Sequence, residues 1–413
     1  MTPSAATLED ALACDAADPL AAMRTRFLLP DGVIYLDGNS LGALPAATPD
    51  RLLAAVREEW GRGLIGSWND HDWIGAPQRV GARIAPLIGA EAHEVVVADS
   101  TSVNLFKLIA AAMAAQPGRS TILSEPGNFP TDLYVASGVA DFLGRTLRTV
   151  PVDDIAQAID DDVAVVVLTH VHYKSGRRLD MAAITAVAQA KGALVLWDLS
   201  HSVGAVEIDL NGANADLAVG CGYKYLNGGP GAPAFLFVAG RHQSTLRSPL
   251  SGWMGHAAPF AFDDGYAPAP GIDRFLCGTP PILGLAALEQ GLAQFEEAEM
   301  AVVAAKSASL CSQLIDQVES RCADARFTLV TPRDAAERGS HVSFAHPDAW
   351  PICRALIARG VIGDFRAPDI LRFGVTPLYT SFADVWRAVD ILCELMATRA
   401  WDRPEYRAAT RVT

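Results

Sequence analysis

The sequence predicts an α/β protein with a mostly parallel sheet covered by helices on both faces, followed by a smaller α+β domain. Apolar strands alternate with helices through the middle of the chain, and this alternation ends near residue 284. The length of 413 residues exceeds the usual size of a single core, which favours two domains.

Continuous apolar runs mark the strands of the first domain. Runs of this length between helical segments are typical of strands buried on both faces of a parallel sheet. We expect strands at 94–99, 121–124, 163–169, 193–197, 217–220 and 234–238. We expect the main helices between them near 102–115, 130–137 and 181–191.

A different pattern follows the segment GTPPILG at 278–284. The chain there predicts one long helical stretch at 285–319, strands at 327–330, 341–344 and 370–374, and helices at 349–359 and 382–398. We therefore expect an N-terminal segment (1–45) that packs with the small domain, a large domain (46–284) and a small α+β domain (285–413).

The composition excludes several classes of protein. A net charge of −14 opposes a broad nucleic-acid-binding surface. No apolar run reaches the roughly 18 residues of a membrane span, and the N-terminus lacks the pattern of a signal peptide. The seven cysteines include no Cys-x-x-Cys pair, which argues against disulfides and structural zinc and favours a reducing cytoplasm.

Lys224 is the candidate amine nucleophile. Only five of the 33 basic residues are lysines, and arginine does not deprotonate usefully. Lys224 alone follows a predicted strand within a glycine-rich stretch, VGCGYKYLNGGPG, where glycines allow close approach of a ligand. A partly desolvated strand end suits a Schiff-base lysine. The alternative, a surface lysine after a strand, does not explain the glycines.

Asp198 and His201 follow the strand at 193–197. Pyridoxal phosphate needs one carboxylate that keeps its pyridine nitrogen protonated, and Asp198 lies 26 residues before Lys224. The alternative for Asp198 is an ordinary turn cap. His201 could orient this acid or touch the phenolic edge of the cofactor, and a purely structural histidine fits equally well.

Other candidates lie at further strand ends. Thr101 and Ser102 begin a helix, where hydroxyl and backbone N–H groups bind anions, although an ordinary N-cap looks the same. Phe129 could stack on a flat ring with Asp132 nearby, or the two could be a core residue and a helix-start acid. Thr169 ends its strand and is open to the same two interpretations.

Two candidates lie later in the chain. Trp253, among small residues in SGWMGH, is more typical of a ligand or subunit contact than of a core. Arg372 interrupts an apolar strand and needs a partner if it is buried, for which a substrate carboxylate would serve. An edge-strand arginine that faces water is the alternative. The absence of a Walker loop and of a Gly-x-Gly-x-x-Gly motif argues against a nucleotide.

Together these segments resemble the kynureninase family, in the aminotransferase class V-like branch of fold-type-I pyridoxal phosphate enzymes. The resemblance covers nearly the whole chain. It rests on YLDGNSLGALP, DSTSVNLF, EPGNFPTDLY, WDLSHSVGAVEIDL, GYKYLNGGPG, SGWMGH, GTPPILG and ILRFGVTPLY. It implies a seven-stranded, mostly parallel sheet in the large domain and a homodimer with shared active sites.

The resemblance also implies pyridoxal 5'-phosphate as the cofactor and assigns roles to the candidates. Lys224 would form the Schiff base, Asp198 would pair with the pyridine nitrogen, and Tyr223 would act as acid and base. Further cofactor contacts would come from Thr101, Ser102, Phe129, Asp132, Thr169, His201 and Tyr223 and, from the neighbouring subunit, Trp253 and Thr279. Substrate contacts would come from Arg372, Asn39 and Ser40.

The implied reaction is hydrolysis of L-kynurenine to anthranilate and L-alanine in tryptophan catabolism, on the kynurenine pathway to NAD biosynthesis. Relatives that prefer 3-hydroxykynurenine resemble one another in carrying Asn where this chain has Thr279, which favours the unhydroxylated substrate.

Three alternatives remain open from the sequence. A cysteine desulfurase or selenocysteine lyase typically has His before the lysine and a reactive cysteine on a mobile loop, whereas Tyr223 stands here and Cys353 and Cys393 fall in predicted helices. An aminotransferase or epimerase would share Lys224 and Asp198. A cofactor-binding regulator usually adds a basic DNA-binding module, and the acidic N-terminal segment shows none.

Overall fold

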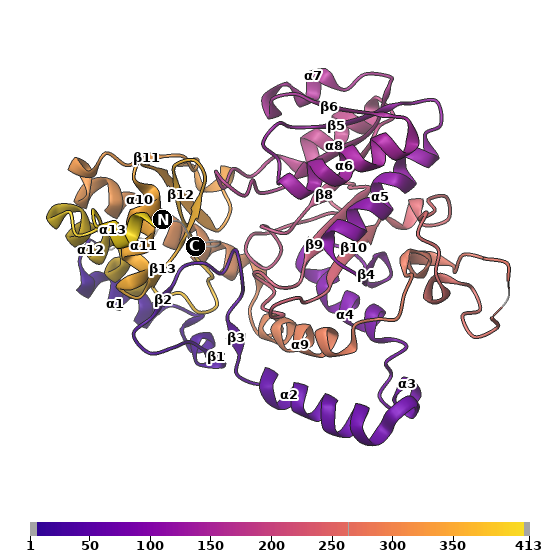
Figure 1. The fold of residues 1–413 in the computed structure, drawn as a ribbon, viewed down its shortest axis with the longest axis horizontal. Helices are drawn as coiled ribbons and strands as arrows, with labels where there is room; N and C mark the ends of the chain where they lie inside the picture. The colour runs from indigo at the N-terminus through magenta and orange to yellow at the C-terminus, as the bar shows by residue number, and fades with distance from the viewer. Residues whose placement is uncertain (1–5, 263, 409–413) are drawn as a thin grey trace.

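The computed structural model describes residues 6–262 and 264–408 and has two lobes (Figure 1). The larger lobe is built on a seven-stranded sheet with the order β4-β10-β9-β8-β7-β5-β6. Its strands are β4 (Val95–Val97), β5 (Thr121–Ser124), β6 (Thr146–Thr149), β7 (Val163–Thr169), β8 (Leu194–Asp198), β9 (Leu217–Cys221) and β10 (Ala234–Val238).

Most of this sheet is parallel, as the sequence predicts. β6, β5, β7, β8 and β9 are parallel neighbours, and β10 runs antiparallel to both β9 and β4. The sequence did not predict β6, because this edge strand (Thr-Leu-Arg-Thr) is partly exposed and lacks the apolar run of its neighbours. The carboxyl ends of β7, β8 and β9 meet at one edge of the sheet.

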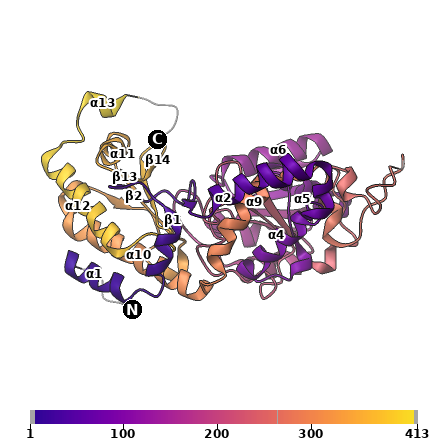
Figure 2. The same ribbon diagram turned by 90° about the horizontal axis from the view of Figure 1, so that it is seen from below.

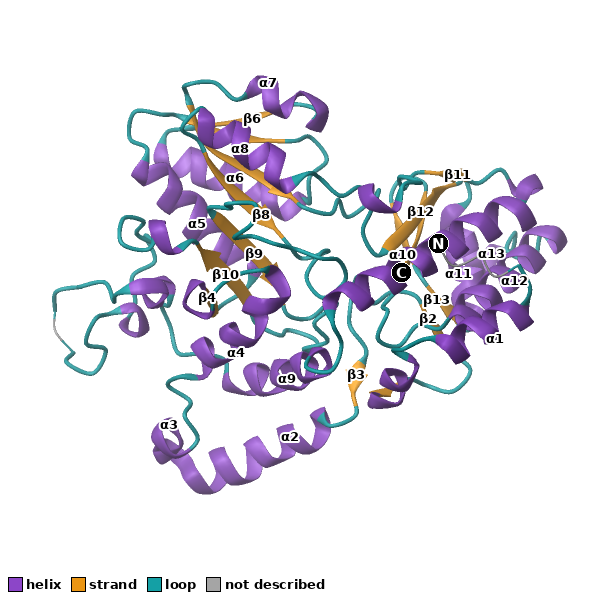
Figure 3. Cartoon of the chain, turned by 180° about the vertical axis from the view of Figure 1, so that it is seen from behind, coloured by secondary structure: helices purple, strands orange, loops and turns teal. Residues whose placement is uncertain are grey.

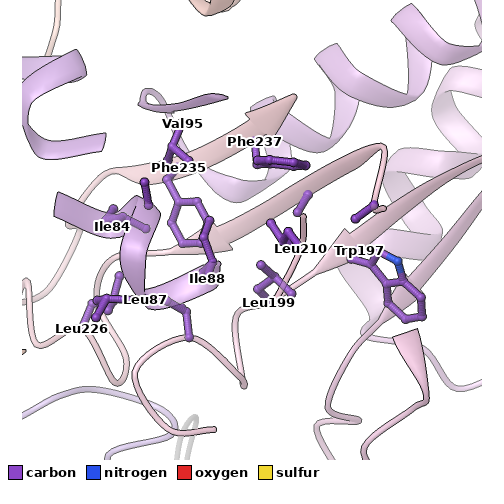
Figure 4. Packing of buried hydrophobic residues seen from close by; sticks show 14 of the residues in the cluster. Ile84, Leu87, Ile88, Val95, Trp197, Leu199, Leu210, Leu226, Phe235 and Phe237 are labelled. Carbon is purple, nitrogen blue, oxygen red and sulfur yellow. The ribbon is translucent and has the colours of Figure 1, made fainter. Parts of the chain in front are cut away.

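Helices cover both faces of the sheet (Figure 3). Alternate strand residues divide between two hydrophobic clusters: Val96 packs with α5 and α6, while Val95 and Val97 pack with α4, α8 and α9. Figure 4 shows the second cluster, in which Trp197 and Phe235 lie among aliphatic side chains. The bounds are α4 (Ala76–Ile84), α5 (Thr101–Ala115), α6 (Pro130–Leu143), α8 (Met181–Ala190) and α9 (Ile282–Leu292).

Three short helices lie at the edges of the larger lobe. α2 (Thr48–Ala54) continues as a π-helix over Ala55–Gly63, and α3 (Ser67–Asp70) follows it. α7 (Ile155–Ala158) precedes β7. α2 packs against α9, which places it along the lower side of the lobe in Figure 1.

The smaller lobe has an antiparallel sheet with the order β11-β12-β15-β14. Helices α10 and α12 pack against each other beside it. The bounds are α10 (Met300–Arg321), β11 (Thr328–Leu329), β12 (His341–Ala345), α11 (Ala349–Ala358), β13 (Val361–Ile362), β14 (Asp364–Arg366), β15 (Ile370–Gly374), α12 (Phe382–Thr398) and α13 (Pro404–Arg407).

The expectation of one helical stretch at 285–319 is wrong. The chain forms α9, a short 3-10 turn and then α10, with a break before Met300. Glu296 and Glu297 lie in this break and form ion pairs with Arg83 and Arg26. The two helices belong to different lobes, so the chain has to change direction between them.

The N-terminal segment connects the two lobes. α1 (Leu8–Ala17) packs against α12 (Figure 2), and β2 (Ile34–Tyr35) pairs in parallel with β13. β1 (Phe27–Leu28) pairs with β3 (Leu44–Pro45). Between these strands, Asp37 forms a bridge with Gly374 of the smaller lobe, and the N–H of Gly42 donates to the carbonyl of Tyr223 in the larger lobe at 2.8 Å.

Among the described helices, none is both long and apolar enough to cross a membrane.

The expectation that no disulfide forms is wrong for one pair of cysteines. Cys322, at the end of α10, is disulfide-bonded to Cys393 of α12. The two residues are 71 positions apart, so no local spacing revealed the pair, and only the packing of α10 on α12 brings their Cα atoms to 5.5 Å. Cys14, Cys221, Cys277, Cys311 and Cys353 are free.

The disulfide predicts a thiol count. Alkylation of the unfolded, unreduced protein should modify five of its seven cysteines, and prior reduction should expose all seven, as intact-protein mass spectrometry would measure. A loop of this length stabilises the fold by about 4 kcal/mol in the chain-entropy estimate, so reduction should lower the midpoint of denaturant unfolding. Labelling of seven thiols without reductant would contradict the pairing.

Candidate active site

Lys224 lies in the turn that follows β9 and is 8% exposed. Its Nζ lies 5.6 Å from the centroid of the Phe129 ring and 5.7 Å from that of Tyr223. Gly42 packs against its backbone so closely that a Cβ there would lie 2.3 Å from the Lys224 carbonyl oxygen. The amine is thus fixed in a small, largely dry space between the sheet edge and the N-terminal segment.

Two buried carboxylates accompany this amine. Asp198 ends β8 and is 3% exposed, and its Oδ1 accepts the Ser200 N–H at 2.7 Å. Asp132, in the first turn of α6, is 1% exposed. Burial raises the pKa of both carboxyl groups, and the positive charge of Lys224 opposes this effect. The charge of Asp198 raises the pKa of Asp132 further, to well above its usual value. Within the part of the chain that the structure describes, Asp132 Oδ1 has no hydrogen-bond partner.

Asn128 joins Asp132 to the strand end, and the sequence did not reveal it. Thr169, at the end of β7, donates to Asn128 Oδ1 and lies 3.4 Å from Asp132 Oδ2. The same amide oxygen accepts the N–H of Phe129 at 2.7 Å, which sets the entry into α6. The Phe129 ring meets Tyr173 edge-on at 5.2 Å, so its face remains directed toward the Lys224 amine.

His201 lies close to a second histidine, His341, which the sequence placed only in a strand. Their ring centroids are 5.4 Å apart. Burial and the charge of Lys224 lower the pKa of His201 well below its usual value, and burial together with Arg372 does the same for His341. His201 Nδ1 and both ring nitrogens of His341 are buried without a partner among the described residues. A neutral histidine ring in this position can donate one hydrogen bond to a ligand and accept another.

Thr101 and Ser102 form the first turn of α5, where unpaired N–H groups favour an anion. The helix begins beside a cavity of about 490 Å³, and Tyr223 and Thr279 are among the residues that line it. Burial raises the pKa of the Tyr223 phenol, so that it stays protonated. The cavity is thus lined by Ser100, the N-cap of α5, together with Tyr223 and Thr279, whereas Thr101 and Ser102 follow directly in the helix and do not line it.

A buried lysine organises the rim of this cavity. Lys107 of α5 is fully buried, forms an ion pair with Asp99, and donates to the carbonyl of Phe275 at 2.7 Å. Asp99 immediately precedes the α5 N-cap and has a φ of 49°. The Cys277 thiol lies 3.6 Å from the same carboxylate. Lys107 therefore ties the start of α5 to the segment that carries Thr279.

Trp253 makes aromatic contacts within its own chain, with Trp68 at 5.7 Å and Phe260 at 5.6 Å. Whether it also reaches a neighbouring subunit stays a prediction. Thr279 is exposed.

Arg372 is 1% exposed and lies on β15, which has β12 and β14 on either side. The alternative of a water-facing edge arginine is therefore wrong. Its Nε donates to Asp364 Oδ1 at 2.8 Å, and its Nη2 donates to Asp364 Oδ2 and to the Ser40 hydroxyl. Its Nη1 donates to the carbonyl of Tyr173. The amide of Asn39 lies against the same guanidinium, 3.0 Å from Nε when its oxygen faces inward.

Asp37 and Asp364 are two acids of this group that the sequence did not single out. Burial and the negative charge of Asp364 raise the pKa of Asp37 to about 7. Asp364 behaves in the opposite way, because Arg372 and Arg366 outweigh the effect of burial and hold its pKa below the usual value. Asp37 lies within the YLDGNSLGALP motif, but nothing in that motif reveals its partner Asp364, which is more than 300 residues away.

The comparisons with known proteins agree with this geometry. The kynureninase of Pseudomonas fluorescens is 53% identical over 98% of this chain and 100% of its own length. The kynureninase of Burkholderia mallei (strain SAVP1) is 52% identical over the same shares. A family model described as the kynureninase C-terminal domain matches residues 303–392.

Solved structures agree in fold at lower identity. The apo cysteine desulfurase of Thermococcus onnurineus NA1 has a TM-score of 0.76 at 19% identity, over 91% of this chain and 98% of its own. A C-DES mutant with glycine covalently linked to its PLP cofactor has a TM-score of 0.78 at 16% identity, over 90% and 99%. At these identities the similarity establishes the fold alone.

The raised pKa of Asp37 predicts a pH-dependent stability. The usual pKa of an aspartate is 3.8, and that of folded Asp37 is about 7. At a pH between these two values the folded chain holds a proton on Asp37 that the unfolded chain has lost, so the contribution of Asp37 to stability falls as the pH rises. Relative to the parent, Asp37→Asn should gain up to about 1.4 kcal/mol in unfolding free energy for each pH unit in that interval. Denaturant unfolding at several pH values from 5 to 8 measures this.

The matched control is Asp31→Asn, an exposed carboxylate on the same segment. Parallel pH profiles for Asp37→Asn and the parent would show that burial does not hold a proton on Asp37.

Proposed function

The chain belongs to the kynureninase family, and from this membership we propose that it hydrolyses L-kynurenine to anthranilate and L-alanine with pyridoxal 5'-phosphate as cofactor. The observation in the structure that carries the proposal is the position of Lys224 beside the Phe129 ring and near enough for its charge to act on the buried carboxyl groups of Asp132 and Asp198. Full-length identity of about half to named kynureninases supports the same reaction.

The residues around Lys224 fit this cofactor. Asp132 Oδ1 and His201 Nδ1 are buried without partners, and such atoms need a ligand that can hydrogen-bond with them. A pyridine N–H and a phenolic oxygen are groups of that kind. We assign Asp198 to the pyridine nitrogen, and Asp132, Thr169 and His201 to the ring edge.

Three further contacts complete the proposed cofactor site. Phe129 would stack on the ring, and Thr101 and Ser102 would hold the phosphate at the start of α5. Tyr223, Trp253 and Thr279 are assigned to the same end, the last two from the neighbouring subunit.

When bound, the cofactor acts as an electron sink for the Cα of an amino acid attached through its amine. Asp198 maintains that sink, because its carboxylate holds a proton on the pyridine nitrogen. Lys224 would hold the cofactor, and its amine would remove the proton from the substrate Cα. Water adds to the γ-carbonyl of kynurenine and the Cβ–Cγ bond breaks, so that one water and one kynurenine give one anthranilate and one alanine. The protonated Tyr223 phenol supplies a proton during this step.

We assign the α-carboxylate of the substrate to Arg372, with Asn39 and Ser40 alongside. Thr279 at the rim of the cavity favours kynurenine over its 3-hydroxy derivative, because this chain lacks the asparagine found at that position in relatives that prefer the latter.

A cysteine desulfurase activity is not favoured, although desulfurases share the fold. That reaction needs a reactive cysteine. Cys221, which faces the site, is 2% exposed, and burial raises the pKa of its thiol. Cys353 is equally buried within a helix, and its thiol contacts the carbonyl of Gly363. It is therefore not on a mobile loop, where a desulfurase carries its reactive cysteine.

We propose that the active protein is a homodimer with shared sites. Large apolar side chains of one region are exposed in the single chain, as expected of a surface that another subunit covers. They include Trp60, Leu64, Ile65, Phe260 and Phe262.

A location in the cytoplasm and a role in tryptophan catabolism and NAD biosynthesis are proposed from the family.

We propose domain boundaries at residue 45 and near residue 284, with the second moved to the end of α9 at Leu292. The hydrophobic cluster of the smaller lobe takes in Ala11 and Leu36, which supports packing of segment 1–45 on that lobe. α9 continues past residue 284 and packs on α2 and α4, so the second boundary fits best just after this helix.

The proposed reaction is tested by product analysis. Purified protein loaded with pyridoxal phosphate should release anthranilate and alanine in equal amounts from L-kynurenine, measured by fluorescence and amino-acid analysis. With 3-hydroxykynurenine, kcat/KM should be lower. A keto acid in place of alanine would indicate transamination and contradict hydrolysis.

Lys224→Ala should abolish the absorption band of the protein-bound cofactor above 400 nm and reduce kcat by at least about a thousandfold, because it removes both the covalent link and the base. Lys191→Ala, at an exposed lysine, is the matched control and should keep both. Retention of the band and of activity in Lys224→Ala would refute the central assignment.

A further inference from the structure

Arg372 has no hydrogen-bond donor left for a substrate. A guanidinium has five N–H groups. Three of them engage Asp364 Oδ1, Asp364 Oδ2 and the Ser40 hydroxyl, and Nη1 donates to the Tyr173 carbonyl. The fifth faces the Asn39 amide oxygen, which lies 3.3 Å from Nη1. An α-carboxylate can reach this guanidinium only by displacing a partner.

We propose that Asp364 is a built-in competitor of the substrate: its carboxylate occupies Arg372 in the empty enzyme, and the α-carboxylate of an incoming amino acid displaces it. The inference rests on the proposed role of Arg372 in substrate binding. It makes Asp364 a residue that sets the affinity for amino-acid carboxylates.

Asp364 is the only one of these partners that an α-carboxylate replaces like for like. It binds Arg372 through two parallel N–H···O contacts, which is the geometry that arginine forms with any carboxylate. The Tyr173 oxygen belongs to the backbone, and Asn39 is fully buried beside Gly374. Exchange of one carboxylate for another leaves the buried guanidinium paired throughout.

Arg366 provides a place for the displaced carboxylate. Its Nη2 already lies 2.7 Å from Asp364 Oδ2, and its side chain is 32% exposed, compared with 1% for Arg372. Both Asp364 and Arg366 lie on β14, a three-residue strand at the edge of its sheet. A small movement of this edge strand would shift Asp364 from the buried guanidinium to the outer one without loss of its counter-ion.

The carboxyl groups already present in the cluster also favour such an exchange. Two guanidinium groups, Arg366 and Arg372, face the two carboxylates Asp37 and Asp364. Among the described residues, Asp37 also acts on the phenols of Tyr35 and Tyr379 and on the thiol of Cys353, all of which burial keeps protonated. His341, which faces Arg372 and Asp364, is kept neutral by burial. A substrate that entered without displacing Asp364 would add a third carboxylate to a small buried space.

Two variants with opposite expected effects test the proposal. The ligands are L-alanine and L-alaninamide, which differ only in the α-carboxylate, and the readout is the dissociation constant from the change in cofactor absorption, in chloride-free buffer. Asp364→Asn removes the competitor, so alanine should bind roughly tenfold more tightly. Arg366→Gln removes the place for the displaced Asp364, so alanine should bind several-fold more weakly. Alaninamide binding should stay the same in both variants.

Weaker or unchanged alanine binding by Asp364→Asn would overturn the proposal, because Asp364 would then position Arg372 or play no part. If Asp364→Asn does not take up the cofactor, the test rests on Arg366→Gln. Unchanged or tighter binding of alanine by Arg366→Gln would then overturn the proposal.

The premise is tested with Arg372→Gln: an equal effect on alanine and alaninamide would remove Arg372 from carboxylate binding and overturn the inference with it. Release of anthranilate by the parent enzyme is measured separately, so failure of the reaction itself is distinguishable.

Discussion

Burial of charge is the constraint on which this site depends. An amine or a carboxylate withdrawn from water is stable only beside a compensating partner. Lys224 satisfies this condition with Asp198 and Asp132, and Arg372 satisfies it with Asp364. The protein therefore presents two prearranged charge groups, which we propose serve a cationic ring and an anionic carboxylate. A substrate that carries both an amine and a carboxylate has to engage both groups.

The fold brings these two groups together through the N-terminal segment. Parallel strands place Asp198 and Lys224 at one edge of the large sheet, whereas Arg372 belongs to the smaller lobe. The stretch from Leu36 to Gly42 crosses between them: Leu36 accepts the N–H of Gly374, and Gly42 donates to Tyr223. This one segment therefore contacts both the smaller lobe and the residue that precedes Lys224.

The predictable parts of the structure are those with a local signal. β7 and β8 are apolar runs, and Asp198 stands out because it ends such a run. The acids around Arg372 lack such a signal. Asp37 and Asp364 are 327 positions apart in sequence and meet only because β2 pairs beside β13. The sequence indicated that a buried arginine would need a carboxylate but left open that the chain provides one itself.

Cysteine desulfurases share this fold, so the fold alone does not determine which reaction takes place. A parallel sheet edge that fixes a lysine beside an acid activates Cα in any amino acid, and the next bond to break depends on what surrounds the rest of the substrate. Here the thiols of Cys221 and Cys353 are buried, the Cys277 thiol at the rim of the cavity contacts the Asp99 carboxylate, and a protonated Tyr223 precedes the lysine. Chemistry at the γ-carbon needs a proton donor and water near that end of the site, whereas chemistry at sulfur needs a nucleophilic thiol there. The few residues that separate these outcomes lie outside the sheet, in the segments at its carboxyl edge.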